Sequence, residues 1–365
     1  MAGRAGIGRF RATHSQQRDP DPAARVALWG LGPMSLAEIG VLWDWAWHRS
    51  PEQQVPLLGL PHPWILPHFL FAFGPVLLLP LLAQGRPGLG HWIGDGCRGS
   101  VREALRGSPG AALGTLGILL FVVASGLDTW RHQWPGPDPA FTAEHVAIAA
   151  SSALVCLGLL LVALEIAHPR WRRWLSWAWL GLLLSAALAP FPPPGVHAWS
   201  AGAQVALALL KLAGPLALAL VVGPRPLPLS AAVGPVVLLR LLTGAALTLA
   251  GYSAVAPALA ALLVPAVLAD GWLGLVGQRP RGWLGAGLVF GLGWGGVGYW
   301  ALLTPPEVWS RLGLLHALLW GALGGTAIGL LAVLTSRVAQ VLVPSRAPSP
   351  RSELPMAEHV RVTLR

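Results

Sequence analysis

Charged side chains are scarce in this chain, and their scarcity excludes an ordinary soluble domain. Only 11% of the residues are charged and 54% are hydrophobic, whereas soluble domains carry about 25% charged residues. The mean hydropathy is +0.60. The alternating pattern of a membrane β-barrel is missing, so the apolar runs are expected to be helices, which satisfy their own backbone groups in lipid. The chain is therefore predicted to be an all-α, polytopic integral membrane protein in a lipid bilayer.

Cysteine is scarce as well, and this excludes a disulfide framework. The two cysteines, Cys97 and Cys156, are predicted to lie in a cytoplasmic loop and inside a membrane span, where they cannot easily pair. Cys156 is expected to be a small buried apolar residue rather than a ligand, since buried free cysteine is common.

The apolar runs predict about ten transmembrane helices, because a helix needs roughly 20 residues to cross the hydrocarbon core. A flexible basic arm at 1–26 precedes the transmembrane domain at 27–338. A disordered tail at 339–365, rich in proline, serine and charge, follows it. The predicted spans are 27–46, 64–84, 110–128, 143–168, 174–191, 198–222, 229–252, 258–275, 283–303 and 311–338.

The distribution of arginine predicts the orientation of these spans. Basic residues collect in cytoplasmic loops, and with the N-terminus inside, the opposite side holds only Arg49, Arg131 and Arg311. Both termini are therefore expected on the cytoplasmic side of the cell (inner or plasma) membrane. The net charge of +10 is accounted for by basic residues facing one leaflet. They are not interleaved with exposed aromatics, so no nucleic-acid partner is expected.

Aspartate and histidine recur in one arrangement at the outward ends of two predicted spans. Asp128 is followed by His132 four residues later and by His145 at the start of the next apolar run. Residues four apart lie on the same face of a helix. Two imidazoles and a carboxylate suit zinc, copper or iron and leave a coordination position open. The pattern therefore predicts a metal site on the external side.

The same arrangement begins in the first predicted span, where Asp44 is followed by His48. The returning histidine has two candidates, since His68 opens the second span and His62 matches the spacing better. With 11 histidines in 365 residues, a histidine falls four residues after a given aspartate by chance roughly 3% of the time. The recurrence suggests a repeat of helix pairs. The alternatives are a polar cluster without metal and polar residues at the membrane interface, where tryptophan also collects.

The spacing Asp-x3-His-x12-His of Asp128, His132 and His145 resembles the copper-binding motif of the C subunit of particulate methane and ammonia monooxygenases. The resemblance covers these three residues and their two helices. It implies that the three side chains are ligands of copper, with zinc as the alternative cofactor. Only Asp44 and His48 of the first copy match the motif cleanly, and the rest of that family's sequence has no counterpart here, so monooxygenase activity is not implied.

A second signal comes from ionisable residues within the predicted spans, which are costly in a bilayer and usually pair or line a polar pathway. Two functions therefore compete, a membrane metalloprotein and a transporter or permease that uses these charges. A third possibility is a structural or assembly subunit. Partners within the membrane or a homo-oligomer are possible, and the residue pattern does not decide whether the protein is an enzyme. These ionisable residues are Glu38, Glu165, Lys211, Arg240 and Asp270.

Overall fold

The computed structural model describes residues 22–48, 50, 66–84, 109–131, 142–188, 201–223, 226–252, 257–302 and 311–342. Every element within these residues is helical. The helices are α1 (Pro22–His48), α2 (Leu66–Val76), α3 (Leu78–Gln84), α6 (Pro109–Arg131), α7 (Ala143–Leu164), α8 (Pro169–Ala187), α9 (Ala201–Val222), α10 (Pro228–Leu249), the 3-10 helix η5 (Pro257–Leu262), α11 (Leu263–Val276), α12 (Pro280–Leu302) and α13 (Arg311–Leu342).

The predicted all-helical class is confirmed for the described residues, and their apolar helices are consistent with a membrane protein. Within the described residues, six helices are long and apolar enough to cross a membrane: α1, α6, α7, α9, α10 and α13. The remaining predicted ranges coincide with helices that are broken, less apolar or shorter. One is split into α2 and α3, α8 begins with three arginines, η5 runs into α11, and α12 is rich in glycine. Six spans therefore follow from length and composition.

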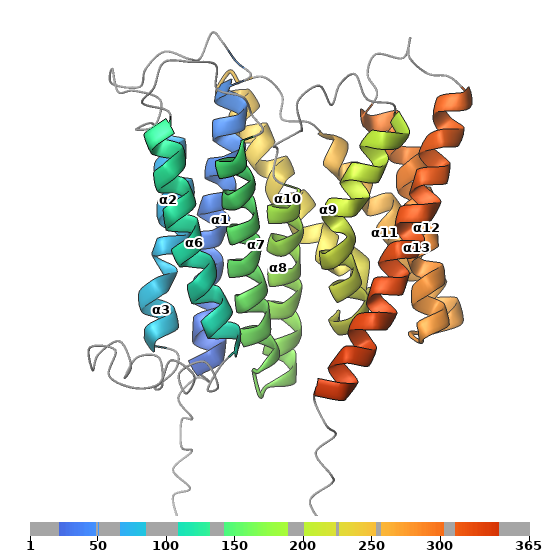
Figure 1. The fold of residues 1–365 in the computed structure, drawn as a ribbon, viewed down its shortest axis with the longest axis horizontal. Coiled ribbons are helices and arrows are strands. Elements are labelled where there is room, and N and C mark those ends of the chain that lie inside the picture. The colour runs from blue at the N-terminus through green and yellow to red at the C-terminus, as the bar shows by residue number, and fades with distance from the viewer. Residues whose placement is uncertain are drawn as a thin grey trace, which may run out of the picture.

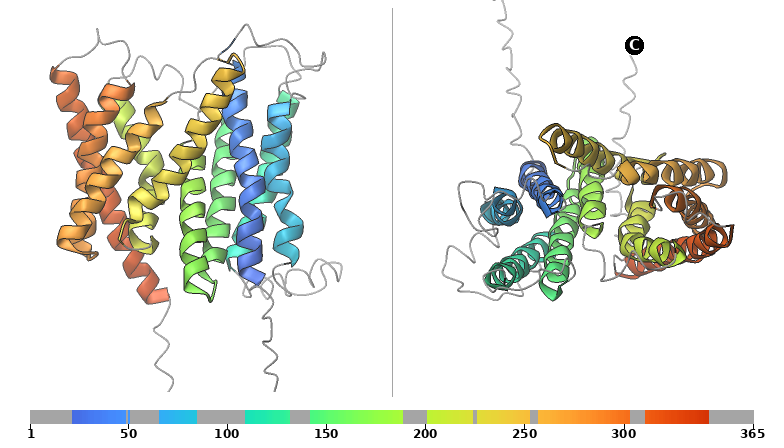
Figure 2. Two further views of the ribbon diagram at one scale, coloured as in Figure 1. Left: turned by 180° about the vertical axis from the view of Figure 1, so that it is seen from behind. Right: turned by 90° about the horizontal axis from the view of Figure 1, so that it is seen from above.

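The helices run roughly side by side along the height of the bundle (Figure 1). The start of α1 and the end of α13 lie at the same end of the bundle. Viewed from above, α1, α2, α6, α7 and α8 form one group, α9, α12 and α13 form another, and α10 and α11 run along one side of both (Figure 2). The main hydrophobic core continues from one group to the other through α8, α9 and α10.

Close backbone contacts hold the helix pairs that carry the Asp and His residues. A side-chain carbon added at Gly40 of α1 would lie 2.6 Å from the amide nitrogen of Phe71 in α2. One added at Gly117 of α6 would lie 2.7 Å from the amide nitrogen of Val155 in α7. Small residues allow such approach between membrane helices. Each pair, α1 with α2 and α6 with α7, is therefore packed backbone to backbone below its outer polar end.

Candidate functional site

Asp128 and His145 meet where α6 ends and α7 begins. The Nε2 atom of His145 lies 3.2 Å from Oδ1 of Asp128, with the two side chains 14% and 7% exposed. Thr142 is the N-cap of α7, and its hydroxyl oxygen accepts a hydrogen bond from the backbone N–H of His145 at 3.1 Å. This cap fixes the first turn of α7, and thereby the position of the imidazole.

A second contact joins the same two helix ends. Nη1 of Arg131, the last residue of α6, donates a hydrogen bond to Oε2 of Glu144 in the first turn of α7 at 3.0 Å. Because Arg131 is largely exposed, this ion pair contributes only about 0–1 kcal/mol. The contact therefore contributes little to holding the two helix ends together, and no side chain of the pair of Asp128 and His145 takes part in it.

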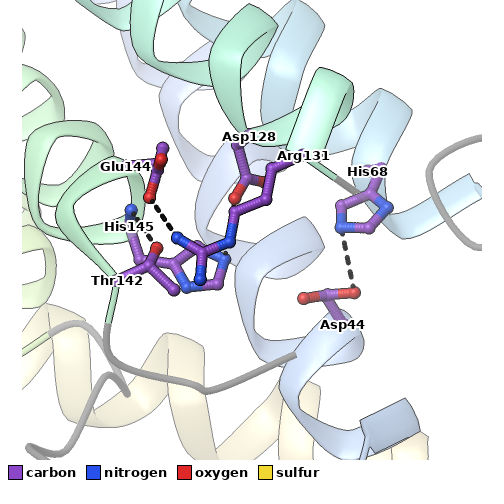
Figure 3. Close-up of polar contacts among 7 residues, drawn as sticks. All are labelled: Asp44, His68, Asp128, Arg131, Thr142, Glu144 and His145. Atoms are coloured by element: carbon purple, nitrogen blue, oxygen red, sulfur yellow. Dashed lines mark hydrogen bonds and ion pairs between the residues drawn. The ribbon is translucent and has the colours of Figure 1, made fainter. Parts of the chain in front are cut away.

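The first copy repeats the contact between aspartate and histidine. Nε2 of His68 in α2 lies 3.3 Å from Oδ1 of Asp44 in α1, and both side chains are mostly buried. Figure 3 shows this pair and the pair of Asp128 and His145 at the same end of the bundle, contributed by four different helices. Among the described residues His68 is thus the histidine that approaches Asp44, and His62 lies outside them.

The remaining predicted ligands are not placed. His132 follows the last residue of α6 and lies outside the described residues, and His48 ends α1 with its side chain outside them. In the part of the chain that the structure describes, no three side chains of His, Cys, Asp or Glu form a group able to hold a metal ion. The described geometry therefore gives two aspartate–histidine pairs, each with two donors.

The charged residues predicted inside the membrane separate into distinct places. Glu38 of α1 and Arg240 of α10 form a buried ion pair, with Nε of Arg240 donating to Oε1 of Glu38 at 2.8 Å. Ser185 of α8 joins them, because its hydroxyl donates to Glu38 and its carbonyl oxygen accepts from Nη2 of Arg240 at 3.0 Å. The cluster ties α1, α8 and α10 together. Of the two basic residues predicted within the membrane, Arg240 is therefore the one that pairs with Glu38.

Asp270 of α11 has a structural partner. Its two carboxylate oxygens accept hydrogen bonds from the backbone N–H groups of Leu229 at 3.1 Å and of Ser230 at 2.7 Å. These are N–H groups of the first turn of α10, which have no partner within their own helix. Asp270 therefore caps α10 from a neighbouring helix, while the half-buried Lys211 lies in α9 and the exposed Glu165 follows the end of α7.

A cavity lies in the group of α1, α2, α6, α7 and α8. Its volume is about 40 Å³, and its polar lining is Glu38 with Ser152 and Cys156 of α7. Phe71 of α2 and Phe121 of α6 belong to the apolar part of the lining, and their rings pack edge to face with centroids 5.6 Å apart.

Several contributing residues were not anticipated from the sequence. The sequence did not predict them, because a single polar residue gives no signal before its partner is known. They are Thr142, Glu144 and Ser185. Thr142 had a readable signal, since a threonine before an apolar run marks a helix start. Comparison of the chain with protein-family models, with curated proteins and with solved structures gives no match.

Proposed function

We propose that this protein is a ten-helix membrane metalloprotein that binds copper on its external side. The site is formed by Asp128, His132 and His145, and zinc is the alternative metal. The observation that carries the proposal is the repeated approach of an aspartate Oδ1 to a histidine Nε2, at 3.2 Å in one helix pair and 3.3 Å in the other.

These separations suit two ligands of one metal ion. Zinc or copper binds imidazole nitrogen and carboxylate oxygen at about 2.0–2.2 Å, and two donors at that distance in tetrahedral geometry lie roughly 3.3–3.6 Å apart. The observed separations of 3.2 and 3.3 Å therefore require little movement on metal binding. They also suit a direct hydrogen bond, so the metal itself must be measured.

His132 is the third ligand in this proposal. It stands four residues after Asp128, a spacing that puts two side chains on the same face of a helix. Two imidazoles and one carboxylate leave an open position for water or substrate. The resemblance to the copper motif of the monooxygenase C subunit assigns the same three residues.

The first copy, with Asp44, His48 and His68, is a second site of the same kind in this proposal, and His62 is its alternative ligand. The two helix pairs are then repeats of one unit, each packed through a glycine below its polar end. Repeated helix pairs are a common way to build membrane folds.

We further propose that all ten helical passes cross the cell membrane with both termini in the cytoplasm. The start of α1 and the end of α13 lie at one end of the bundle (Figure 1), which an even number of passes requires. Both aspartate–histidine pairs lie at the opposite end, where arginine is scarce. By the preference of basic residues for the cytoplasm, that end faces outward.

Metal analysis of the purified full-length protein tests the metal site. The wild type should retain copper or zinc through purification. Asp128→Ala and His132→Ala should each lower the metal content by the amount bound at the site of Asp128, His132 and His145. Arg131→Gln is the matched control, since it removes only the exposed ion pair with Glu144 and should leave the metal content unchanged. A metal content that is absent, or equal in wild type and both alanine variants, contradicts the proposal.

A transporter or permease is the second candidate function, favoured by the cavity that reaches the buried Glu38. A substrate or proton route past this carboxylate should depend on Arg240, its ion-pair partner. Transport is measured in vesicles that contain the protein with Arg240 and Lys211 replaced by neutral residues. If transport activity persists in this variant, such a route is excluded.

A further inference from the structure

Two sulfur side chains and a carboxylate line the same cavity inside the bundle. Met34 and Glu38 stand one turn apart on α1, and Cys156 faces them from α7. All three are buried, with exposed fractions of 5%, 8% and 1%. The whole chain contains only three methionines and two cysteines. That one of each lines a single cavity beside a buried carboxylate is therefore a specific arrangement of donors.

We propose that Met34, Cys156 and Glu38 form an inner site for a soft monovalent metal ion, Cu(I), which Ag(I) can replace. Thioether and thiolate ligands select Cu(I) over harder ions. The cavity has a volume of about 40 Å³, and one water needs about 10–15 Å³. The space is thus sufficient for one ion, and Ser152 is a further polar group in the lining.

The charge of the surroundings favours a monovalent ion. Glu38 and Arg240 form a neutral ion pair in the absence of metal. Binding then follows Cu⁺ + Cys156–SH → Cys156–S–Cu + H⁺, so one S–H bond breaks, one S–Cu bond forms and the proton leaves to solvent. The net charge of the buried group is zero before and after. A divalent ion would leave one uncompensated positive charge, which is costly in the membrane interior.

The inner site is distinct from the outer aspartate–histidine pairs. Phe71, Phe121 and Ile148 line the cavity as well and form a small apolar cluster with Ala124. His68 and His145 stand three residues before Phe71 and Ile148. This apolar cluster therefore separates the inner cavity from the outer aspartate–histidine pairs. The inference does not depend on the outer metal site, because its ligands belong to none of the outer pairs.

The test measures Cu(I) affinity of the full-length protein in detergent, by competition with the chromogenic chelator bicinchoninate under a reductant. Cys156→Ser should weaken Cu(I) binding at least about tenfold, because it removes the thiolate ligand. Met34→Leu should weaken it less, because the thiolate remains. The chain supplies matched controls: Cys97→Ser and Met356→Leu remove the other cysteine and the other internal methionine, and both should bind within about twofold of wild type. Equal affinity in Cys156→Ser and wild type overturns the proposal.

A second measurement keeps the inner site testable if Cys156→Ser fails to fold. X-ray absorption of Cys97→Ser protein, loaded with one Cu(I) per chain, should show sulfur neighbours at about 2.3 Å, near the metal–thiolate distance. A spectrum with only nitrogen and oxygen neighbours overturns the inner site.

The failure of the outer site has a different signature. Asp128→Ala should leave the Cu(I) affinity within about twofold of wild type if the inner site binds the ion. If Asp128→Ala weakens Cu(I) binding and Cys156→Ser does not, Cu(I) occupies the outer pair and the inner site is refuted.

Discussion

Replacing Arg240 by methionine is expected to destabilise the bundle by about 3–5 kcal/mol, because the change leaves the buried carboxylate of Glu38 without its counter-charge. Arg240 is 7% exposed, so water cannot replace the lost partner. The same substitution also removes the hydrogen bond that Arg240 donates to the carbonyl oxygen of Ser185 at 3.0 Å. Helix α10 thereby loses its polar contacts with α1 and α8, whereas the hydrogen bond from Ser185 to Glu38 remains.

The double variant Glu38→Met/Arg240→Met separates the energy of the ion pair from the penalty of an unpaired charge. Replacing both members of a buried pair by apolar residues is often neutral or stabilising. The double variant should therefore be more stable than Arg240→Met alone, although it carries one more substitution. Glu165→Gln, at an exposed position after α7, is the control and should change stability by less than about 0.5 kcal/mol.

Detergent-induced unfolding, followed by the fluorescence of the 19 tryptophans, measures these differences. The account predicts strong non-additivity between the two substitutions. A loss below about 1 kcal/mol for Arg240→Met, or a double variant that loses the sum of the two single losses, would refute the assignment of a buried ion pair.

Substitutions at Asp270, Gly117 and Thr142 test local contacts by the same unfolding assay. Asp270→Ala should cost about 0.5–2 kcal/mol by removing the cap of α10, and Asp270→Asn, which keeps one acceptor, should cost less; equal costs would contradict capping. Gly117→Val should separate α6 from α7 and destabilise strongly, whereas Gly126→Val, with open space around it, should not. Thr142→Ala should cost about 0.5–2 kcal/mol, and no change would show that His145 is positioned without the cap.

Hydropathy predicted where the helices run, because the length of a membrane helix is set by the bilayer. The structure has helices at all of the predicted ranges, and six of these meet the length and hydropathy of a span within the described residues. The breaks were harder to predict. The range 64–84 contains prolines at positions 75 and 80, and the chain turns at Leu77 between α2 and α3.

The candidate site was predictable only in part, since spacing along the chain gives no rotation of one helix against another. Spacing favoured His62 as the returning histidine of the first copy; His62 lies outside the described residues, and within them His68 approaches Asp44. The sequence placed Glu38, Lys211 and Arg240 within the membrane but gave no partner for Glu38, which the position of α10 supplies as Arg240. These partners could be identified only from the way in which the helices pack.

Contacts between distant segments could not be predicted from the sequence for the same reason. Asp270 was predicted as an intramembrane charge, and its role as a cap rests on N–H groups 40 and 41 residues away. Cys156 was expected to pack as a small apolar residue and is indeed buried. Its place beside Met34 and Glu38 in one cavity follows only from the approach of α7 to α1.

Electron paramagnetic resonance of the Cu(II)-loaded protein tests the central claim most directly. The account predicts a bound Cu(II) signal with hyperfine structure from imidazole nitrogen, which weakens in His132→Ala and in His145→Ala and persists in Arg131→Gln. A protein that binds no Cu(II), or a signal that is identical in wild type and both histidine variants, would contradict the proposed site at Asp128, His132 and His145.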